Sequence, residues 1–98
     1  MRIKITRSAA AQIDDAAGWW AQNRQFAPGA IQEELERSFS LLSIQPGIGA
    51  RARNAKLAGV RRLHLSRIHY YLYYRVSADA VEILAFWHTS REVRPPLR

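Results

Sequence analysis

Apolar residues recur with a helical period in the first half of the chain. Between residues 9 and 24 they fall three and four positions apart, which places them on one face of a helix. The same spacing runs from about residue 28 to residue 44, where Gln45-Pro46-Gly47 ends it. We expect Ser8 to cap the first helix. Because the connection between the helices is short, they should form an antiparallel hairpin.

A period of two marks the predicted strands, because alternate side chains of a strand point to opposite faces of a sheet. It is found at residues 2–6, 60–65, 68–76 and 81–88. Glycine, proline and polar residues predict a loop over residues 46–59 and turns at residues 66–67 and 77–80. The Pro95-Pro96 pair predicts an irregular tail at about residues 89–98.

The element order is strand, helix, helix, strand, strand, strand, which predicts a two-layer α+β fold. The last three strands form a meander, and the first strand must pair somewhere in the same sheet because unpaired backbone groups are costly. We expect an antiparallel meander sheet with the helical hairpin packed on one face. With 98 residues, 48% of them hydrophobic, the chain is expected to form one domain over residues 1–98.

The predicted strand at residues 68–76 has one apolar and one more polar face. We assign to the helix side Ile68, Tyr70, Leu72, Tyr74 and Val76, and to the open side His69, Tyr71, Tyr73 and Arg75. The last strand is apolar on both faces, which indicates that something covers the open side. Trp19 lies outside the apolar stripe of its helix, so it is either an interface anchor or a cover over the helix edge.

Charge is distributed unevenly along the chain. There are 15 Lys and Arg against 8 Asp and Glu, for a formal net charge of +7, and the whole excess follows residue 50. Such a surface usually meets nucleic acid, an acidic protein or a membrane surface, although a solvated face is the alternative. No apolar run is long enough to span a membrane, and no secretory signal opens the chain. The absence of cysteine excludes disulfides and thiolate metal sites, and fits the cytoplasm.

The sequence offers few groups for catalysis. His64, His69 and His88 lie on three predicted strands without a metal-binding spacing, and paired carboxylates, phosphate-binding loops and nucleophile motifs are missing. We therefore expect no metal and no cofactor. The strand end from His88 to Arg91 could combine a general acid or base with a phosphate-stabilising guanidinium, or the histidine could simply cap the strand.

Three stretches of the second half resemble the RelE/ParE superfamily of bacterial type II toxins. They are residues 56–65 (KLAGVRRLHL), 69–76 (HYYLYYRV) and 81–91 (VEILAFWHTSR). The fold of this superfamily has the element order derived above, so the resemblance covers nearly the whole chain. The tyrosine-rich strand and the His88-to-Arg91 ending are most similar to the ParE branch, whose members poison DNA gyrase.

The resemblance to ParE implies a cytoplasmic toxin that inhibits DNA gyrase by binding, without a catalytic site of its own. We assign target binding to the cations Arg51, Arg53, Arg61, Arg62, Arg67, Arg91 and Arg94. The superfamily also implies a small, acidic, partly disordered antitoxin in a toxin–antitoxin hetero-oligomer. We expect its contacts to include Trp19, Tyr71, Tyr73 and Phe86.

Two alternatives stay open. RelE-like members cut ribosome-bound mRNA, and a ribonuclease site here would consist of His88 with Arg67, Arg75 and Arg91. The tail lacks the tyrosine that ribonuclease members often carry. The other alternative is a binding module that keeps the fold and has lost toxicity.

Overall fold

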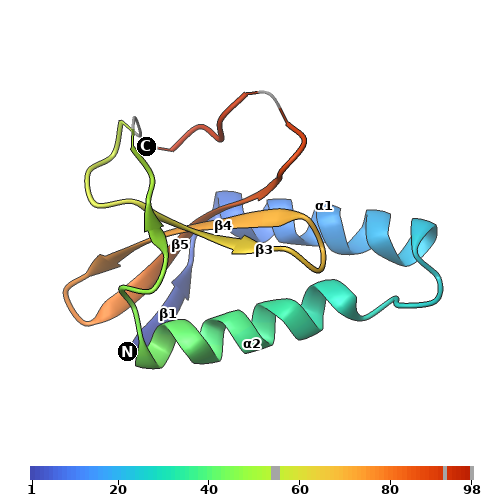
Figure 1. Cartoon of the computed structure of the whole chain (residues 1–98), viewed down its shortest axis with the longest axis horizontal. Helices are drawn as coiled ribbons and strands as arrows, with labels where there is room; N and C mark the ends of the chain where they lie inside the picture. Colours follow the sequence, from blue (N-terminus) through green and yellow to red (C-terminus); the bar gives the residue numbers. More distant parts are fainter. Residues whose placement is uncertain (54–55, 92, 98) are drawn as a thin grey trace.

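The computed structural model describes residues 1–53, 56–91 and 93–97 of the chain. Its elements are β1 (Arg2–Ile5), α1 (Arg7–Asn23), α2 (Ala30–Ile44), β2 (Ala50–Arg51), β3 (Arg61–Leu65), β4 (Tyr70–Ser77) and β5 (Ala80–His88). The strands form one sheet in the order β1-β5-β4-β3-β2, and both helices lie on the same side of it (Figure 1). This confirms the predicted two-layer α+β fold with a helical hairpin on one face of the sheet.

The structure gives the partner of each edge strand. β1, whose pairing the sequence left open, pairs with β5 in parallel, so the sheet is mixed. A parallel pair needs a long crossover connection, and everything between β1 and β5 serves as one. The predicted loop at residues 46–59 contains β2, which pairs with β3 over two residues and is too short to show a period.

The first helix begins two residues earlier than expected. Thr6, not Ser8, is its N-cap, because the Thr6 hydroxyl accepts a hydrogen bond of 3.2 Å from the Ala9 amide. Serine and threonine are both good caps. The prediction of Ser8 was wrong because β1 runs directly into the helix, with only Thr6 between Ile5 and Arg7.

The main core lies between the helices and the sheet. Its fully buried side chains include Ile31 and Leu42 from α2, and Leu72 and Tyr74 from β4. The Tyr70 ring stacks on Phe86 at a centroid distance of 4.3 Å. The helix-side assignment is thereby confirmed for four residues, Ile68, Tyr70, Leu72 and Tyr74. Val76 pairs with Val81, a residue of the main core, but it is 42% exposed near the end of β4.

An irregularity in β5 explains why this strand is apolar on both faces. Tyr73 pairs with Ala85 and Tyr74 with Ile83, which leaves Leu84 as an extra residue of β5. A bulge of this kind shifts the alternation of side chains by one residue. Ile83 therefore packs in the main core, whereas Leu84 and Ala85 belong to a second apolar cluster on the opposite face.

The protein itself covers part of that opposite face. The second cluster consists of Val60, Tyr73 and Ala85 with Ala52, Leu57, Tyr71, Leu84, Trp87 and Leu97 packed against them. Figure 1 shows the C-terminal tail, in red, running over the side of the sheet away from the helices. The tail is irregular as predicted between residues 93 and 97, yet its Pro95 is buried. The predicted covering of the open side is therefore supplied in part by the tail.

Candidate functional site

Most of the predicted target-binding arginines line one pocket on the side of the sheet away from the helices. The pocket has a volume of about 640 Å³, and we call it the basic pocket. Its cations are Arg51, Arg53, Lys56, Arg62 and Arg94. Its other lining residues are Ala52, Tyr73, Pro95, Pro96 and Leu97. No carboxylate lines this pocket within the described part of the chain.

Three separate segments build the basic pocket. The pairing of Ala50 with Arg62 and of Arg51 with Arg61 fixes β2 along β3. The tail reaches the same place because the Trp87 indole N–H donates to the Val93 carbonyl at 2.8 Å. The Arg94 guanidinium then donates to the Arg53 carbonyl at 3.3 Å.

Arg62 is held in place by an aromatic ring. Its guanidinium lies 4.1 Å from the centre of the Tyr71 ring, at the distance of a cation–π contact. This contact orients the guanidinium without neutralising it, so its full charge remains for a ligand. Tyr71 was predicted as an antitoxin contact, and it lies half-buried on this same face.

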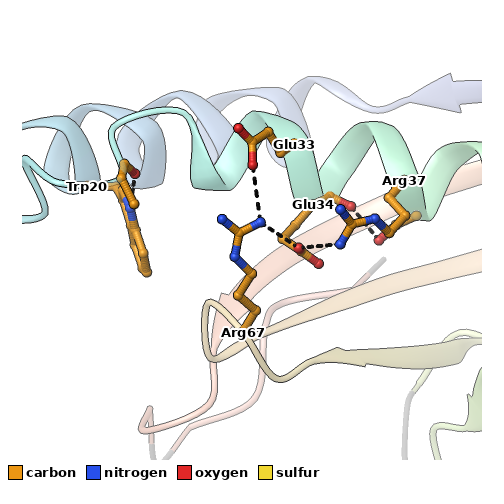
Figure 2. Close-up of polar contacts among 7 residues, drawn as sticks. Trp20, Glu33, Glu34, Arg37 and Arg67 are labelled. Carbon is orange, nitrogen blue, oxygen red and sulfur yellow. Dashed lines mark hydrogen bonds and ion pairs between the residues drawn. The ribbon is translucent and has the colours of Figure 1, made fainter.

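Two of the predicted target-binding arginines have structural contacts elsewhere. Arg61 is half-buried and donates a hydrogen bond of 2.8 Å to the Gly49 carbonyl. Arg67 turns toward α2, as Figure 2 shows, and contacts Glu33 at 3.1 Å and Glu34 at 3.0 Å. The hydrogen bond to Glu34 raises the pKa of the Arg67 guanidinium above its ordinary value, and the hydrogen bond to Glu33 raises it further. Neither residue lines the basic pocket.

Glu34 is the centre of this ionic cluster. It is 8% exposed, and its carboxylate also accepts from Arg37 at 2.8 Å. A buried carboxylate is costly unless it is paired, and here it has two guanidinium partners (Figure 2). Two glutamates of α2 therefore neutralise Arg67. Because they lie more than thirty residues before it in the sequence, no local pattern predicts this pairing.

The four residues of the alternative ribonuclease site do not gather at one place. His88 pairs with Tyr70, whereas Arg75 pairs with Glu82 at the other end of β4. Arg75 lies five positions after Tyr70, which is roughly 17 Å at the usual rise of a strand. Arg75 also forms an ion pair of 2.8 Å with Glu82, and Arg67 is committed to α2.

Arg91 and His88 occupy the end of β5. The Arg91 guanidinium lies 4.0 Å from the centre of the Trp87 ring. Nδ1 of His88 is 2.7 Å from the Ser90 hydroxyl, and the Ser90 amide donates to the same nitrogen at 3.1 Å. His88 therefore orders the turn after the strand, in line with the capping interpretation.

The histidines are far from a metal-binding arrangement. His64 lies on β3, and His69 lies in the turn before β4 with a φ of 62°, so the placement of His69 on a strand was wrong. Within residues 1–53, 56–91 and 93–97, no cluster of three potential ligands is close enough to hold a metal ion.

The predicted antitoxin contacts lie on both sides of the sheet. Trp19 is 49% exposed on α1, and it lines a smaller pocket of about 330 Å³ with Tyr70 and His88. Tyr73 is 6% exposed on the opposite face. Phe86 is 2% exposed and packs in the helix-facing core, so its side chain offers almost no surface in this conformation.

Sequence reasoning missed Gln12 in this smaller pocket. Its amide oxygen accepts a hydrogen bond of 2.8 Å from the Phe86 amide of β5. The pairing of β1 with β5 ends at Ile83, and Gln12 binds the amide of Phe86, three residues farther along β5. No sequence signal marks this role, because it depends on where a helix and a strand edge meet.

No described helix is long and apolar enough to cross a membrane.

A family model for the ParE toxin of the parDE type II toxin–antitoxin system matches residues 3–93. Comparison with curated proteins gave no match. A solved structure of the chromosomal ParDE toxin–antitoxin system from P. aeruginosa is similar, with 26% identity and a TM-score of 0.73. The similarity covers 92% of this chain and 97% of that one. The chain belongs to the ParE toxin family of type II toxin–antitoxin systems.

Proposed function

We propose that this protein is a cytoplasmic toxin that inhibits DNA gyrase by binding it and is neutralised by an antitoxin. The observation that carries the proposal is the basic pocket, where five cations lie without a described carboxylate beside them. A surface of one sign attracts an acidic partner and speeds encounter with it. A gyrase–DNA complex presents such an acidic surface.

Inhibition by binding, without catalysis, agrees with the positions of the candidate catalytic groups. Arg67 and Arg75 each have a carboxylate partner, and His88 is hydrogen-bonded to Ser90. A general acid or base must lie within hydrogen-bond reach of the group that it serves. The separation of His88 from Arg75 along β4 argues against one ribonuclease centre that includes both.

A supercoiling assay tests the gyrase proposal. The purified full chain is added to gyrase, relaxed plasmid and ATP, and in parallel to a translation reaction in which mRNA is monitored for cleavage. We expect loss of supercoiling and intact mRNA. Normal supercoiling with codon-linked mRNA cleavage would instead identify a RelE-like ribonuclease. No effect in either assay, and no effect on growth, would identify a binding module without toxicity.

A pair of double variants tests the role of the cationic surface. Arg53→Gln/Arg62→Gln removes two exposed charges from the basic pocket, and Lys4→Gln/Arg7→Gln removes two exposed charges elsewhere. We expect the first double variant to inhibit gyrase roughly tenfold less well and the second to inhibit normally, because the contact depends on position. Equal losses in both variants would indicate a dependence on net charge alone. Arg61 is left unchanged because it supports the Gly49 carbonyl.

We propose an acidic antitoxin that wraps around the protein rather than covering one face. Trp19 is exposed on α1, whereas Tyr71 lies on the other side of the sheet under Arg62. One partner contacts both only if it passes around an edge of the sheet. Trp19→Ala and Tyr71→Ala should therefore each weaken the same complex with the protein from a neighbouring acidic reading frame. If neither substitution changes the affinity, the wrapping proposal is wrong.

A further inference from the structure

We propose that the basic pocket is a binding site for a nucleoside polyphosphate, such as a nucleoside 5′-triphosphate. This proposal goes beyond the inhibition of gyrase and is tested in the absence of gyrase, so either proposal can fail without the other. It rests on the charge, the lining and the closure of the basic pocket.

The charge of the pocket favours a multiply charged anion. Four arginines and Lys56 line it, all of them positively charged at neutral pH. Like charges held close together repel one another, and the described chain places no carboxylate among them to relieve this. Guanidinium groups bind phosphate oxygens in a bidentate manner. A triphosphate presents several negative charges within a few ångströms, which matches this density of cations.

The lining also contains an uncharged part that bare phosphate would leave empty. The uncharged lining consists of Ala52, Tyr73 and Leu97, together with Pro95 and Pro96 of the tail. The volume of about 640 Å³ falls within the range of small-molecule sites, roughly 300 to 1,000 Å³. Guanidinium planes stack on nucleobases, and the Arg62 guanidinium already stacks on Tyr71. A ligand with both phosphates and a flat ring would use both parts of the lining.

The surroundings of the pocket favour a nucleotide over an acidic peptide. An extended peptide is usually held by the unpaired backbone of a sheet edge. The strand at this edge, β2, has only two residues and offers little backbone for such pairing. The Arg94 contact to the Arg53 carbonyl joins the tail to the segment after β2, which closes the pocket on one side. An extended peptide rises by about 3.3 Å per residue and carries at most one charge on each side chain, so its charges are more dilute than those of a triphosphate.

Calorimetric titration of the full chain with four probes tests the proposal at physiological salt. The probes are ATP, inorganic triphosphate, adenosine and hexaglutamate. We expect ATP to bind at least about tenfold more tightly than inorganic triphosphate or hexaglutamate, and adenosine alone not to bind, because phosphate and ring contribute together. Arg53→Gln/Arg62→Gln should weaken ATP binding by about tenfold or more, whereas Lys4→Gln/Arg7→Gln should leave it unchanged.

Several results would overturn the proposal. If hexaglutamate binds as tightly as ATP, the pocket is an acidic-peptide site. If inorganic triphosphate binds as tightly as ATP, the pocket recognises phosphate charge alone and makes no use of the nucleoside. Equal weakening by both double variants would show that only net charge matters. Circular dichroism and thermal unfolding of each variant check that Arg53→Gln/Arg62→Gln acts on binding rather than on folding. If that double variant unfolds, the single variant Arg62→Gln decides, since its side chain is exposed.

Discussion

Gly49 lies where the backbone before β2 passes against the buried ring of Tyr74. The Gly49 amide donates to the Tyr74 hydroxyl at 2.8 Å, which satisfies that hydroxyl inside the core. A Cβ at this position would lie 2.6 Å from the hydroxyl oxygen and 3.0 Å from the Arg62 carbonyl. Glycine is therefore required here by close approach.

Replacing this glycine should destabilise the fold. We expect Gly49→Ala to lower the free energy of unfolding by about 1–3 kcal/mol, the usual range for overpacking. Gly47→Ala is the matched control, because its Cβ would meet no atom within 4 Å. Urea denaturation of both variants measures the difference. Equal stability of the two variants would contradict the close contact between Gly49 and Tyr74.

Tyr74 should also make stability depend on pH under alkaline conditions. Burial raises the pKa of its phenol, and the hydrogen bond with Gly49 lowers it by less. The unfolded chain therefore loses the proton first, at a pH of about 10. The contribution of Tyr74 is fully present below that pH and is lost as the pH rises from there through the higher pKa of the folded state.

The unfolding free energy should accordingly fall as the pH rises above about 10. Tyr74→Phe should be less stable than the wild type at neutral pH, because the Gly49 amide loses its acceptor. The same variant should show a shallower alkaline decline, since it lacks one of the tyrosines with a raised pKa. Denaturation series at successive pH values measure both slopes. Parallel slopes would show that Tyr74 does not titrate differently in the two states.

At the scale of elements, Glu34 ties α2 to the turn between β3 and β4. We expect Glu34→Gln to lower the unfolding free energy clearly more than Glu33→Gln. The Glu34 side chain is 10% exposed and pairs with two arginines, whereas the Glu33 side chain is 60% exposed and, among the described residues, pairs with one arginine, Arg67. Exposed pairs are screened by solvent and contribute little. Thermal unfolding at low and high salt measures both effects, and equal losses would refute a special role for Glu34.

The two helices and the strands β1, β3, β4 and β5 could be predicted because their patterns are local. A helical stripe or an alternation of side chains is visible within about ten residues. The parallel pairing of β1 depends on where the chain returns, and the extra residue Leu84 depends on how β5 meets β4. Both are decided by contacts between segments far apart in the sequence. The sequence therefore showed that β5 is apolar on both faces without showing why.

The same limit applies to the candidate site. Cations after residue 50 were identified as a binding surface, and four of them, Arg51, Arg53, Arg62 and Arg94, do line one pocket. Arg67 was expected among them, but Glu33 and Glu34 lie more than thirty residues earlier and hold it on the other side of the sheet. The gathering of Arg94 with Arg53 depends on the tail folding back, which proline-rich sequence alone does not indicate.

For the whole molecule, the two layers differ in charge as the two halves of the sequence do. The first 50 residues carry equal numbers of cations and acids, and they supply β1, the two helices and Ala50 of β2. The excess of cations belongs to the rest of the sheet, the loop and the tail, and five of them meet at the basic pocket. The helical layer therefore supports the sheet, while the opposite face presents charge to a partner.

The tail should control the shape of that charged face. Trp87→Phe keeps an aromatic ring beneath Arg91 but removes the indole donor to the Val93 carbonyl. We expect faster amide hydrogen exchange in the tail and weaker binding at the basic pocket, with the unfolding free energy lowered by only about 1 kcal/mol. The tail supplies Arg94, Pro95 and Leu97 to the pocket, so its release removes one wall.

Trp19→Phe is the matched control, because it makes the same replacement on α1, away from the tail. Hydrogen exchange followed by mass spectrometry compares the two variants. Faster exchange in the tail of Trp87→Phe alone would support a tail fastened by its indole hydrogen bond. Unchanged exchange in Trp87→Phe would mean that the packing of Pro95 and Leu97 holds the tail by itself. The wall of the basic pocket would then be a fixed part of the fold.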